Sequence, residues 1–421
     1  MTQALLDQQY MQRAIVLAQQ GVGSTPPNPA VGCVIVQNGQ IIGEGFHRQA
    51  GGPHAEVFAL RQAADAAKGA TAYVTLEPCS HFGRTPPCAN ALIAAGISRV
   101  VVAMTDPNPQ VAGRGIAMLQ QAGIAVTTGV CTSDARQLNP EFLFKMEQQR
   151  PLVRLKLACS LDGAVALASG ESQWLTGPLA REDVQLWRAR SCAILSTAET
   201  VKTDKATLTV RSTAVNPLPN GLLRQPLRII LDRRCRLSGA EPLFQTGGDL
   251  LLIHCGEPTS WPELELPADA QLIDEEQQRT HLATAAEATT TVAAVSRQVR
   301  RWRIGLDEVG QLDLPALFAK LRDEKLNSIW VEAGAKLATS LWQLQLVDEL
   351  LVYQAPLLLG LGAQPLLRLP APTSLAQASR WHWQQAVLLG PDVRLYAKLG
   401  NTATNDSADV GMPAQPSFAQ G

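Results

Sequence analysis

The chain has 421 residues, of which 46% are hydrophobic and 17% are charged. At ~100–200 residues per domain, this length predicts two domains. A net charge of −1 gives no global attraction to nucleic acid, so a small-molecule partner is favoured. The first twenty residues lack the pattern of a signal peptide, and no run is apolar enough to span a membrane. The eight cysteines predict reduced thiols, so we expect a cytoplasmic protein that does not bind membranes.

The first half alternates helical and strand patterns. A helix is expected around Asp7 to Gln20, followed by the strands "AVGCVIV" and "IIGEGFH", which Asn38-Gly39 joins as a hairpin turn. The later segments are "AEVFALRQAADAA", "ATAYVTL", "CANALIAAG", "RVVVAM", "GIAMLQQAG" and "IAVTTG". This alternation predicts a three-layer α/β domain with helices on both faces of a central sheet.

The second half alternates again after a charged, less periodic passage from Asn139 to Pro151. Strands are expected in "PLVRLKLACS", "CAILS", "PLRIILD", "DLLLIHC" and "SIWVEAG", and helices in "PLAREDVQLWRAR", "LPALFAKLRDE" and "AKLATSLWQLQ". "VDELLVYQAPLLLG" closes the series. The predicted division is residues 1–148, residues 149–399 and a small, polar, disordered tail over residues 400–421.

Four residues of the first half indicate a metal site. Pro53 and Pro86-Pro87 fit the first turns of helices, which places His54, Glu56 and Cys88 at helix N-termini. The positive ends of these helices favour thiolate over thiol. Together with Cys79, His54 and Cys88 supply three ligands, the protein's share of a catalytic zinc ion that keeps its fourth position for water.

Glu56 is then expected to carry protons between the attacking water, the ring nitrogen and the departing ammonia. A histidine and a non-ligand glutamate at H-x-E, followed by P-C and a second cysteine, form the signature of zinc-dependent nucleobase deaminases. The alternative is a closed structural zinc site, for which His81 is the nearby fourth ligand, or simple core packing.

The spacing of the two cysteines departs from that signature, because eight residues separate Cys79 from Cys88 instead of two. The insertion lies beside the metal and can reach a substrate. Within it, Arg84 could form charge-assisted hydrogen bonds to a phosphate, or could simply face solvent.

The first half resembles the deaminase part of the bifunctional riboflavin-biosynthesis deaminase/reductase family. The resemblance lies in "TPPNPAVGCVIV", "GEGFH", "GGPHAEVFAL", "YVTLEPCSHFGRTPPC" and "DPNPQVAGRGIAMLQQAGI". It implies a cytidine-deaminase-like αβα fold, one zinc ion and Glu56 as the acid/base. It also implies that Asn28 and His47 line the pyrimidine pocket, with Asp106 and Asn108 as weaker candidates in a motif that could equally be a turn.

The second half offers only hints from its own residues. "WVEAGAKLATSL" places a glutamate and a glycine between a strand and a helix, where backbone N–H groups can hold a phosphate. There is no G-x-G-x-x-G, so an ordinary Rossmann dinucleotide site is not indicated.

The resemblance to the same family extends through "LKLACSLDGAVALASGESQWLTG", "AREDVQLWRARSCAIL", "TLTVR" and "SIWVEAGAKLATSL". It implies a dihydrofolate-reductase-like α/β fold that uses NADPH. The implied contacts to the phosphoribosyl substrate are Ser172, Arg188, Leu208, Arg211 and Glu332. The implied contacts to NADP are Ala158, Trp174, Thr200, Asp204, Gly334, Ala335, Lys336, Leu337, Ala338, Thr339 and Ser340.

Four side chains of the second half also suggest chemistry. Arg188 and Arg211 could clamp the ribose 5-phosphate, because guanidinium groups bind phosphate through two hydrogen bonds. Lys156 and Glu332 could polarise or protonate the opened sugar as hydride arrives.

Three positions in two segments depart from the family pattern. "DKATLTVR" has Lys205 and Ala206 where an acidic or amide residue and a proline are usual, and the lost proline should make that loop more mobile. Arg233 stands where a small hydroxylated residue is common, and it could pair with the 2′-phosphate of NADP.

The leading hypothesis is a bifunctional enzyme of riboflavin synthesis. Its first domain would remove the 2-amino group of a diaminopyrimidinone ribosylamine phosphate by hydrolysis, and its second would reduce the ribose of the product to ribityl with NADPH. We expect no nucleic-acid partner and a homo-oligomer. The alternatives are a base deaminase that acts on nucleic acid through "RQVRRWR", or a zinc module fused to a degenerate reductase.

Overall fold

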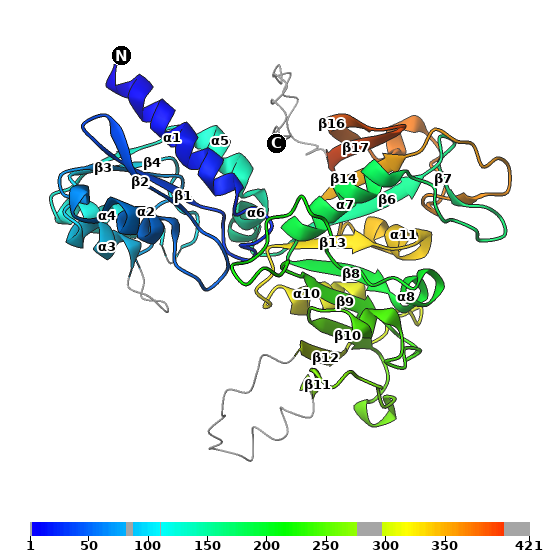
Figure 1. Cartoon of the computed structure of the whole chain (residues 1–421). Coiled ribbons are helices and arrows are strands. Elements are labelled where there is room, and N and C mark those ends of the chain that lie inside the picture. The colour runs from blue at the N-terminus through cyan, green and yellow to red at the C-terminus, as the bar shows by residue number, and fades with distance from the viewer. Residues whose placement is uncertain (1, 81–86, 110, 276–296, 400–421) are drawn as a thin grey trace.

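A computed structural model describes residues 2–80, 87–109, 111–275 and 297–399 of the chain (Figure 1). The predicted tail and Arg84 lie outside these described residues. Two sheets organise the molecule, a five-stranded sheet in the first half and a ten-stranded sheet in the second. In the described part of the chain, no helix is both long and apolar enough to cross a membrane.

The five-stranded sheet has the order β2-β1-β3-β4-β5. Its strands are β1 (Gly32–Gln37), β2 (Gln40–Phe46), β3 (Thr71–Val74), β4 (Arg99–Val102) and β5 (Ala125–Thr128). β1 is antiparallel to both β2 and β3, whereas β3, β4 and β5 are parallel. The predicted hairpin between β1 and β2 is confirmed, with positive φ angles at both Asn38 and Gly39.

Helices cover both faces of this sheet, which confirms the predicted three layers. The helices are α1 (Gln3–Gln19), α2 (Ala55–Ala63), α3 (Cys88–Ala94), α4 (Arg114–Gln121), α5 (Thr132–Leu138) and α6 (Pro140–Gln148), with the 3-10 turn η1 (Ala64–Ala67) after α2. α1, α5 and α6 share one apolar core with the sheet, and α2, α3 and α4 share the other. α1 approaches β1 so closely that a Cβ at Gly32 would lie 1.9 Å from the Ala14 carbonyl oxygen, so only glycine fits there.

The ten-stranded sheet has the order β11-β12-β10-β9-β8-β13-β6-β14-β17-β16. Its strands are β6 (Leu152–Cys159), β8 (Ala193–Thr197), β9 (Leu227–Leu231), β10 (Leu250–His254), β11 (Ala270–Asp274), β12 (Arg297–Arg303), β13 (Ser328–Glu332), β14 (Glu349–Gln354), β16 (Trp381–Leu389) and β17 (Asp392–Leu399). The first eight strands of that order are mutually parallel, and the hairpin of β16 and β17 adds an antiparallel edge. A small separate pair is formed by β7 (Ala164–Ala166) and β15 (Gln364–Pro365).

Helices lie on both faces of the large sheet as well. They are α7 (Pro178–Arg190), α8 (Ala198–Asp204), α10 (Leu314–Leu321) and α11 (Ala335–Gln343), with short 3-10 turns η2 (Pro242–Gln245), η3 (Pro258–Ser260) and η4 (Leu375–Gln377). α10 and α11 pack into one core, and α7 and α8 pack into the other. The expected mixed α/β class of the second half is therefore confirmed.

The passage between the halves differs from the prediction. We expected an aperiodic connection from Asn139 to Pro151, but most of it is helix α6. Phe142 and Leu143 of this helix are buried in the core of the first half, while Glu141 pairs with Arg154 on β6 at 2.6 Å. The helix therefore belongs to the contact between both halves, and the expected division after residue 148 stays a prediction.

Candidate active sites

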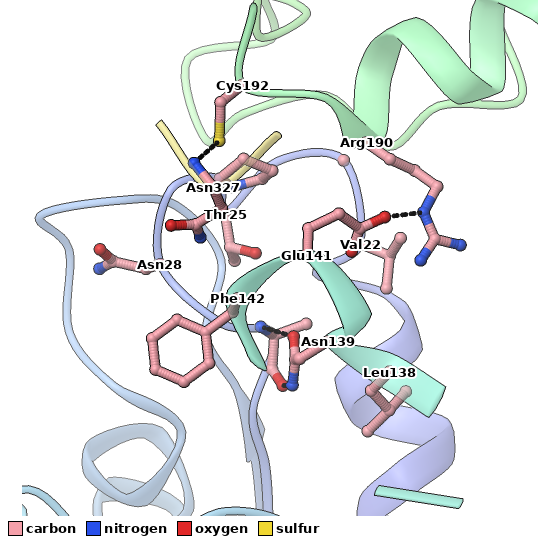
Figure 2. A pocket seen from close by; sticks show the side chains of 13 residues that line it. Val22, Thr25, Asn28, Leu138, Asn139, Glu141, Phe142, Arg190, Cys192 and Asn327 are labelled. Atoms are coloured by element: carbon pink, nitrogen blue, oxygen red, sulfur yellow. Dashed lines mark hydrogen bonds and ion pairs between the residues drawn. The ribbon is translucent and has the colours of Figure 1, made fainter. Parts of the chain in front are cut away.

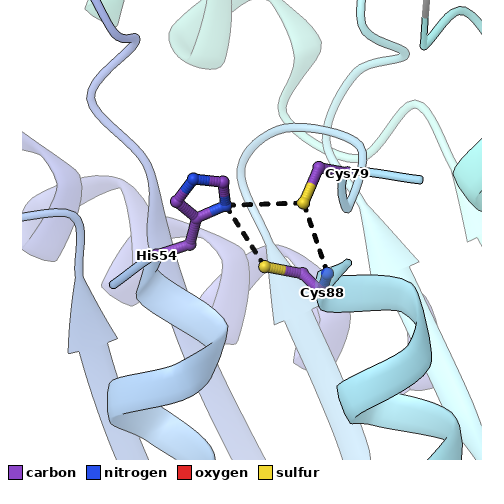
Figure 3. Close-up of side chains that lie close together, drawn as sticks. All are labelled: His54, Cys79 and Cys88. Atoms are coloured by element: carbon purple, nitrogen blue, oxygen red, sulfur yellow. Dashed lines mark hydrogen bonds between the residues drawn. The ribbon is translucent and has the colours of Figure 1, made fainter. Parts of the chain in front are cut away.

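Three potential zinc ligands converge from separate elements of the first half (Figure 3). His54 is the N-cap residue of α2, and Cys88 is the first residue of α3, as the adjacent prolines predicted. Cys79 lies in the segment that follows β3. Figure 3 shows the imidazole of His54 turned toward both sulfur atoms.

The spacing of the three ligand atoms fits one tetrahedral ion. His54 Nδ1 lies 3.5 Å from Cys79 Sγ and 3.2 Å from Cys88 Sγ, and all three ligand atoms lie within 4.8 Å of one another. Around tetrahedral zinc, with bonds of about 2.0 Å to nitrogen and about 2.3 Å to sulfur, the nitrogen-to-sulfur separation is about 3.5 Å. The donor set of one imidazole and two thiols is also the one that zinc prefers.

The pKa values of the two thiols are shifted in opposite directions. A hydrogen bond with the Cys88 side chain, helped by His54, lowers the pKa of Cys79 to about 4. The same interaction and burial raise the pKa of Cys88. The backbone N–H of Cys88 also donates to Cys79 Sγ at 3.2 Å, so the start of α3 stabilises the thiolate that a metal ion needs.

Glu56 is buried next to these ligands, with 3% of its surface exposed. Burial raises the pKa of this carboxyl group, and its Oε2 atom has no hydrogen-bond partner among the described residues. A buried carboxylate oxygen without a partner is costly unless a ligand or water satisfies it. The side chain is therefore suited to hold and release a proton beside the metal ligands.

Asn28 and His47 form a second polar pair close to the ligands. His47 Nδ1 lies 3.0 Å from the Pro53 carbonyl oxygen, which can only accept, so this nitrogen carries the hydrogen. His47 Nε2 then accepts from the Asn28 amide at 3.1 Å, which leaves the Asn28 carbonyl oxygen for another partner. The His47 and His54 rings meet edge to face at 5.2 Å, so this pair adjoins the potential zinc ligands.

The segment that contains Asp106 and Asn108 forms a turn. The backbone N–H of Asn108 donates to Asp106 at 2.8 Å, and the buried Glu77 accepts from the N–H groups of Asp106, Gly113 and Gly115. Glu77 therefore fixes this turn against the chain that leads to Cys79. Sequence reasoning did not assign that role, although Glu77 stands in the quoted "LEPC" motif.

The second site is a cavity of about 810 Å³ at the carboxyl ends of the parallel strands of the large sheet. Eleven of the residues implied by the family resemblance line it: Ala158, Ser172, Trp174, Arg188, Thr200, Asp204, Leu208, Arg211, Glu332, Gly334 and Ala335, of which Ala335 is the first residue of α11. The N-terminus of α11 thus opens toward the cavity, where its free N–H groups can meet a phosphate.

Arg188 and Glu332 are paired with each other across the cavity wall. Arg188 Nε and Nη2 donate to the Glu332 carboxylate at 2.5 and 2.8 Å, and Arg188 Nη1 donates to the Thr209 carbonyl oxygen at 3.0 Å. Although burial opposes it, this arginine lowers the pKa of Glu332 to about 2. Burial also lowers the pKa of Lys156, which faces Glu332 from β6. Glu332 is therefore an ionised carboxylate that lies beside two basic side chains, Arg188 and Lys156.

Arg211 is exposed and differs from Arg188 in its contacts. Its side chain donates to Thr207 Oγ1 at 3.2 Å, and its backbone N–H donates to Gln185 Oε1 at 2.9 Å. Gln225 binds both the N–H and the carbonyl of Val210, at 2.8 and 3.0 Å. Gln185 and Gln225, which sequence reasoning missed, therefore hold the loop that follows Lys205. The greater mobility expected from the missing proline in that loop stays a prediction.

The remaining predicted cofactor residues lie outside the cavity lining. Arg233 follows β9 and donates to the Gly310 carbonyl oxygen at 2.5 Å. Lys336, Leu337, Ala338, Thr339 and Ser340 continue along α11, away from its first turn. Their contacts to NADP stay predictions.

The basic segment "RQVRRWR" is strand β12, inside the large sheet between β10 and β11. Its arginines form ion pairs with carboxylates of neighbouring segments: Arg297 with Asp269, Arg300 with Glu275 and Glu324, Arg301 with Asp274, and Arg303 with Glu257. Val299 and Trp302 of this strand are buried, so the segment is part of the packed sheet.

Two family models match the chain in the order of its two sites. Residues 5–104 match the cytidine and deoxycytidylate deaminase zinc-binding region, and residues 151–393 match the RibD C-terminal domain. The riboflavin biosynthesis protein RibD of Escherichia coli is 48% identical over 396 residues, which cover 93% of this chain and 98% of that protein. The chain belongs to the RibD family. The RibD protein of Haemophilus influenzae is similar at 45% identity over 397 residues, covering 92% of this chain and 95% of its own.

Solved structures of the RibD family agree with the fold. Acinetobacter baumannii RibD has a TM-score of 0.78 at 41% identity and covers 95% of this chain and 100% of its own. A Thermotoga maritima protein, described as a diaminohydroxyphosphoribosylaminopyrimidine deaminase and 5-amino-6-(5-phosphoribosylamino)uracil reductase, has a TM-score of 0.74 at 29% identity, with 95% and 100% covered.

Membership of the RibD family assigns the chain's activities. The chain is a bifunctional deaminase and reductase of riboflavin biosynthesis, with a cytidine-deaminase-like first domain and a dihydrofolate-reductase-like second domain. A zinc ion belongs to the first and a nicotinamide cofactor to the second. Its substrates are small molecules.

Proposed function

We propose that the first domain hydrolyses the 2-amino group of diaminohydroxyphosphoribosylaminopyrimidine, and that the second reduces 5-amino-6-(5-phosphoribosylamino)uracil to its ribityl form with NADPH. These are the two compounds that the Thermotoga maritima relative is described as converting. The observation that carries the first half of the proposal is the convergence of His54, Cys79 and Cys88 beside the buried Glu56.

In the deaminase site, His54, Cys79 and Cys88 would hold zinc. When bound, this metal supplies hydroxide at neutral pH, because zinc lowers the pKa of a water ligand to about 7. Glu56 takes one proton from the attacking water at its unpartnered Oε2 and passes it to the ring nitrogen. A second proton, from the hydroxyl group added to the ring, then passes through the same carboxylate to the leaving amine. The side-chain NH2 group of Asn28 donates to His47, so Asn28 offers its side-chain carbonyl oxygen to an N–H donor of the pyrimidine. Arg84 is proposed to meet the substrate phosphate.

In the reductase site, the cavity residues that the family resemblance implied would hold the sugar phosphate and NADPH. When bound, the cofactor supplies the hydride. Arg211 is the better candidate for the phosphate, because it is exposed, while Arg188 is bound to Glu332 and to the Thr209 carbonyl. Lys156 and Glu332 stand on adjacent strands, where an ammonium group can donate a proton to the opened sugar while Glu332 stays ionised. Ser172 and Leu208 complete the substrate side.

We also propose a homo-oligomeric enzyme of the cytoplasm that has no nucleic-acid partner. The eight cysteines are free thiols in the structure, which suits a reducing compartment. Trp383 and Leu388 are exposed on the edge strand β16, where a second copy could pack. Light scattering at several concentrations measures the oligomeric state, and a monomer at all of them would contradict this part of the proposal.

The deaminase assignment is tested with the diaminopyrimidine substrate, the wild-type protein and Glu56→Gln. Wild type should release ammonia with or without NADPH, and should oxidise NADPH only after ammonia has appeared. Glu56→Gln should keep one zinc per chain but lose ammonia release by about a hundredfold or more, because it cannot transfer a proton.

The same variant carries its own control. Glu56→Gln should still oxidise NADPH at the wild-type rate when it is given the deaminated intermediate, since the second site is intact. Unchanged ammonia release would contradict the role of Glu56, and NADPH oxidation before deamination would reverse the proposed order of steps.

A further inference from the structure

The loop from Gln20 to Val31 connects α1 to β1 and carries Asn28. The first domain holds this loop at its end: the Asn139 side chain binds the N–H and the carbonyl of Ala30, at 2.7 and 2.8 Å. Within the loop, the N–H of Asn28 donates to the Thr25 carbonyl oxygen at 2.9 Å. These contacts leave other backbone carbonyl groups of the loop to find partners elsewhere.

The reductase domain provides those partners. Asn327 Nδ2, at the residue before β13, donates to the Pro27 carbonyl oxygen at 2.5 Å. Arg224 Nε donates to the Gly23 carbonyl oxygen at 3.0 Å. Arg224 is itself fixed, since its Nη2 donates to the Ala189 carbonyl oxygen at 2.8 Å.

A cavity of about 30 Å³ marks where the two domains meet around this loop. Figure 2 shows Asn327 and Cys192 of the reductase domain next to the loop that carries Thr25 and Asn28, with the Asn28 side chain directed away from both. Asn327 is 8% exposed, so its hydrogen bond to Pro27 is shielded from solvent. A shielded hydrogen bond restrains its partner more than one that competes with water.

We propose that Asn327 of the reductase domain, assisted by Arg224, is a positioning residue of the deaminase site. The Pro27 carbonyl belongs to the peptide unit that ends at the nitrogen of Asn28, so holding its oxygen fixes the plane from which Asn28 projects. Asn28 must meet both His47 and the pyrimidine, and small errors in such placement are costly. This inference rests on the proposed contact of Asn28 with the substrate.

The test is the steady-state deamination kinetics of Asn327→Ala in the full-length protein with zinc bound. The KM for the diaminopyrimidine should rise about 3- to 10-fold, the effect of one hydrogen bond. The kcat should change less than about twofold, because Glu56 and the metal ligands are untouched. Zinc content and the KM of the reductase reaction should stay at wild-type values.

Asn216→Ala is the matched control. Asn216 Nδ2 also donates across the domain contact, at 3.0 Å to the Gln20 carbonyl oxygen, but this bond lies eight residues before Asn28 and is exposed. It should leave the deaminase KM unchanged. A rise equal to that of Asn327→Ala would mean that general loosening of the contact is responsible, and would overturn the proposal.

A double-mutant cycle with Asn28→Ala separates this inference from the proposed function. If Asn327 acts through Asn28, the double variant should have the KM of Asn28→Ala alone. Additive effects, or a raised KM in Asn28→Ala with none in Asn327→Ala, would overturn the positioning role. If neither single variant changes the KM, the substrate contact of Asn28 is wrong and the positioning role falls with it.

Discussion

At the scale of single residues, hydrogen bonding decides what each polar side chain can still offer a ligand. Arg188 and Arg211 look equivalent in sequence, and both line the reductase cavity. Arg188 directs two of its nitrogens to Glu332 and one to a backbone carbonyl, whereas Arg211 is exposed. The two arginines should therefore make different contributions, with Arg188 shaping the site and Arg211 meeting the phosphate.

Arg233 gives a prediction at this scale. It follows the carboxyl end of β9, an interior strand of the large sheet, and its Nη1 atom donates to the Gly310 carbonyl oxygen, which fixes the side chain. If it pairs with the 2′-phosphate, Arg233→Ala should lower the preference for NADPH over NADH about tenfold, or ~1.4 kcal/mol. The ratio of kcat/KM for the two cofactors measures this, and an unchanged ratio would remove Arg233 from the cofactor site. Arg234→Ala, which removes the same charge from an exposed neighbour, is the control.

The convergence of His54, Cys79 and Cys88 could be predicted from sequence, but the pairing of Arg188 with Glu332 could not. His54 and Cys88 each stand beside a proline that marks a helix start, so local rules placed them at N-termini that converge. Arg188 and Glu332 lie 144 residues apart and meet only because β8 and β13 are neighbours in the sheet. The order of strands in the sheet cannot be predicted from a local sequence pattern.

At the scale of elements, α6 is the segment that sequence reasoning misjudged most. Its charged residues hid the helical period, because Glu141 faces inward and pairs with Arg154 and Arg190 at 2.6 and 3.2 Å. The hairpin of β16 and β17 was also missed, since Trp383 and Leu388 are apolar but exposed, so apolar and polar residues do not alternate along β16 as in a half-buried strand. Tertiary contacts, rather than local period, define both elements.

The buried ion pairs of Glu141 make a prediction about stability. Glu141→Gln should lower the free energy of unfolding by about 3 kcal/mol near neutral pH, because it leaves Arg154 and Arg190 with less compensating charge. Chemical denaturation measures the loss. Glu147→Gln, on the same helix but in an exposed pair with Arg136, should change stability by less than about 0.5 kcal/mol.

The effect of Glu141→Gln should depend on pH. Although burial opposes it, Arg190 and Arg154 lower the pKa of Glu141 to about 2, below the value of about 4.3 for an unfolded chain. The carboxylate therefore stabilises the fold fully above about pH 4.3, and this contribution is lost as the pH falls toward 2. The difference between wild type and variant should shrink over that window, and a constant difference would contradict the assigned pair.

At the scale of the whole molecule, the domain contact and the reductase cavity lie at opposite ends of the strands of the large sheet. The first domain meets the reductase domain at Cys192 and Asn327, just before β8 and β13 begin. The reductase cavity opens where these parallel strands end, at Thr200, Glu332 and Gly334. A five-residue strand spans about 16 Å, and the sheet between the sites is densely packed. The strands of the sheet therefore separate the domain contact from the reductase cavity.

This arrangement predicts that the intermediate equilibrates with solvent between the two reactions. Wild-type protein given labelled diaminopyrimidine, NADPH and an excess of unlabelled deaminated intermediate should form ribityl product whose label is diluted in proportion to that excess. Product formation without added intermediate should begin with a lag while the free intermediate accumulates. Undiluted label, or the absence of a lag, would require a passage between the sites, either through the domain contact around Asn327 or between chains of an oligomer.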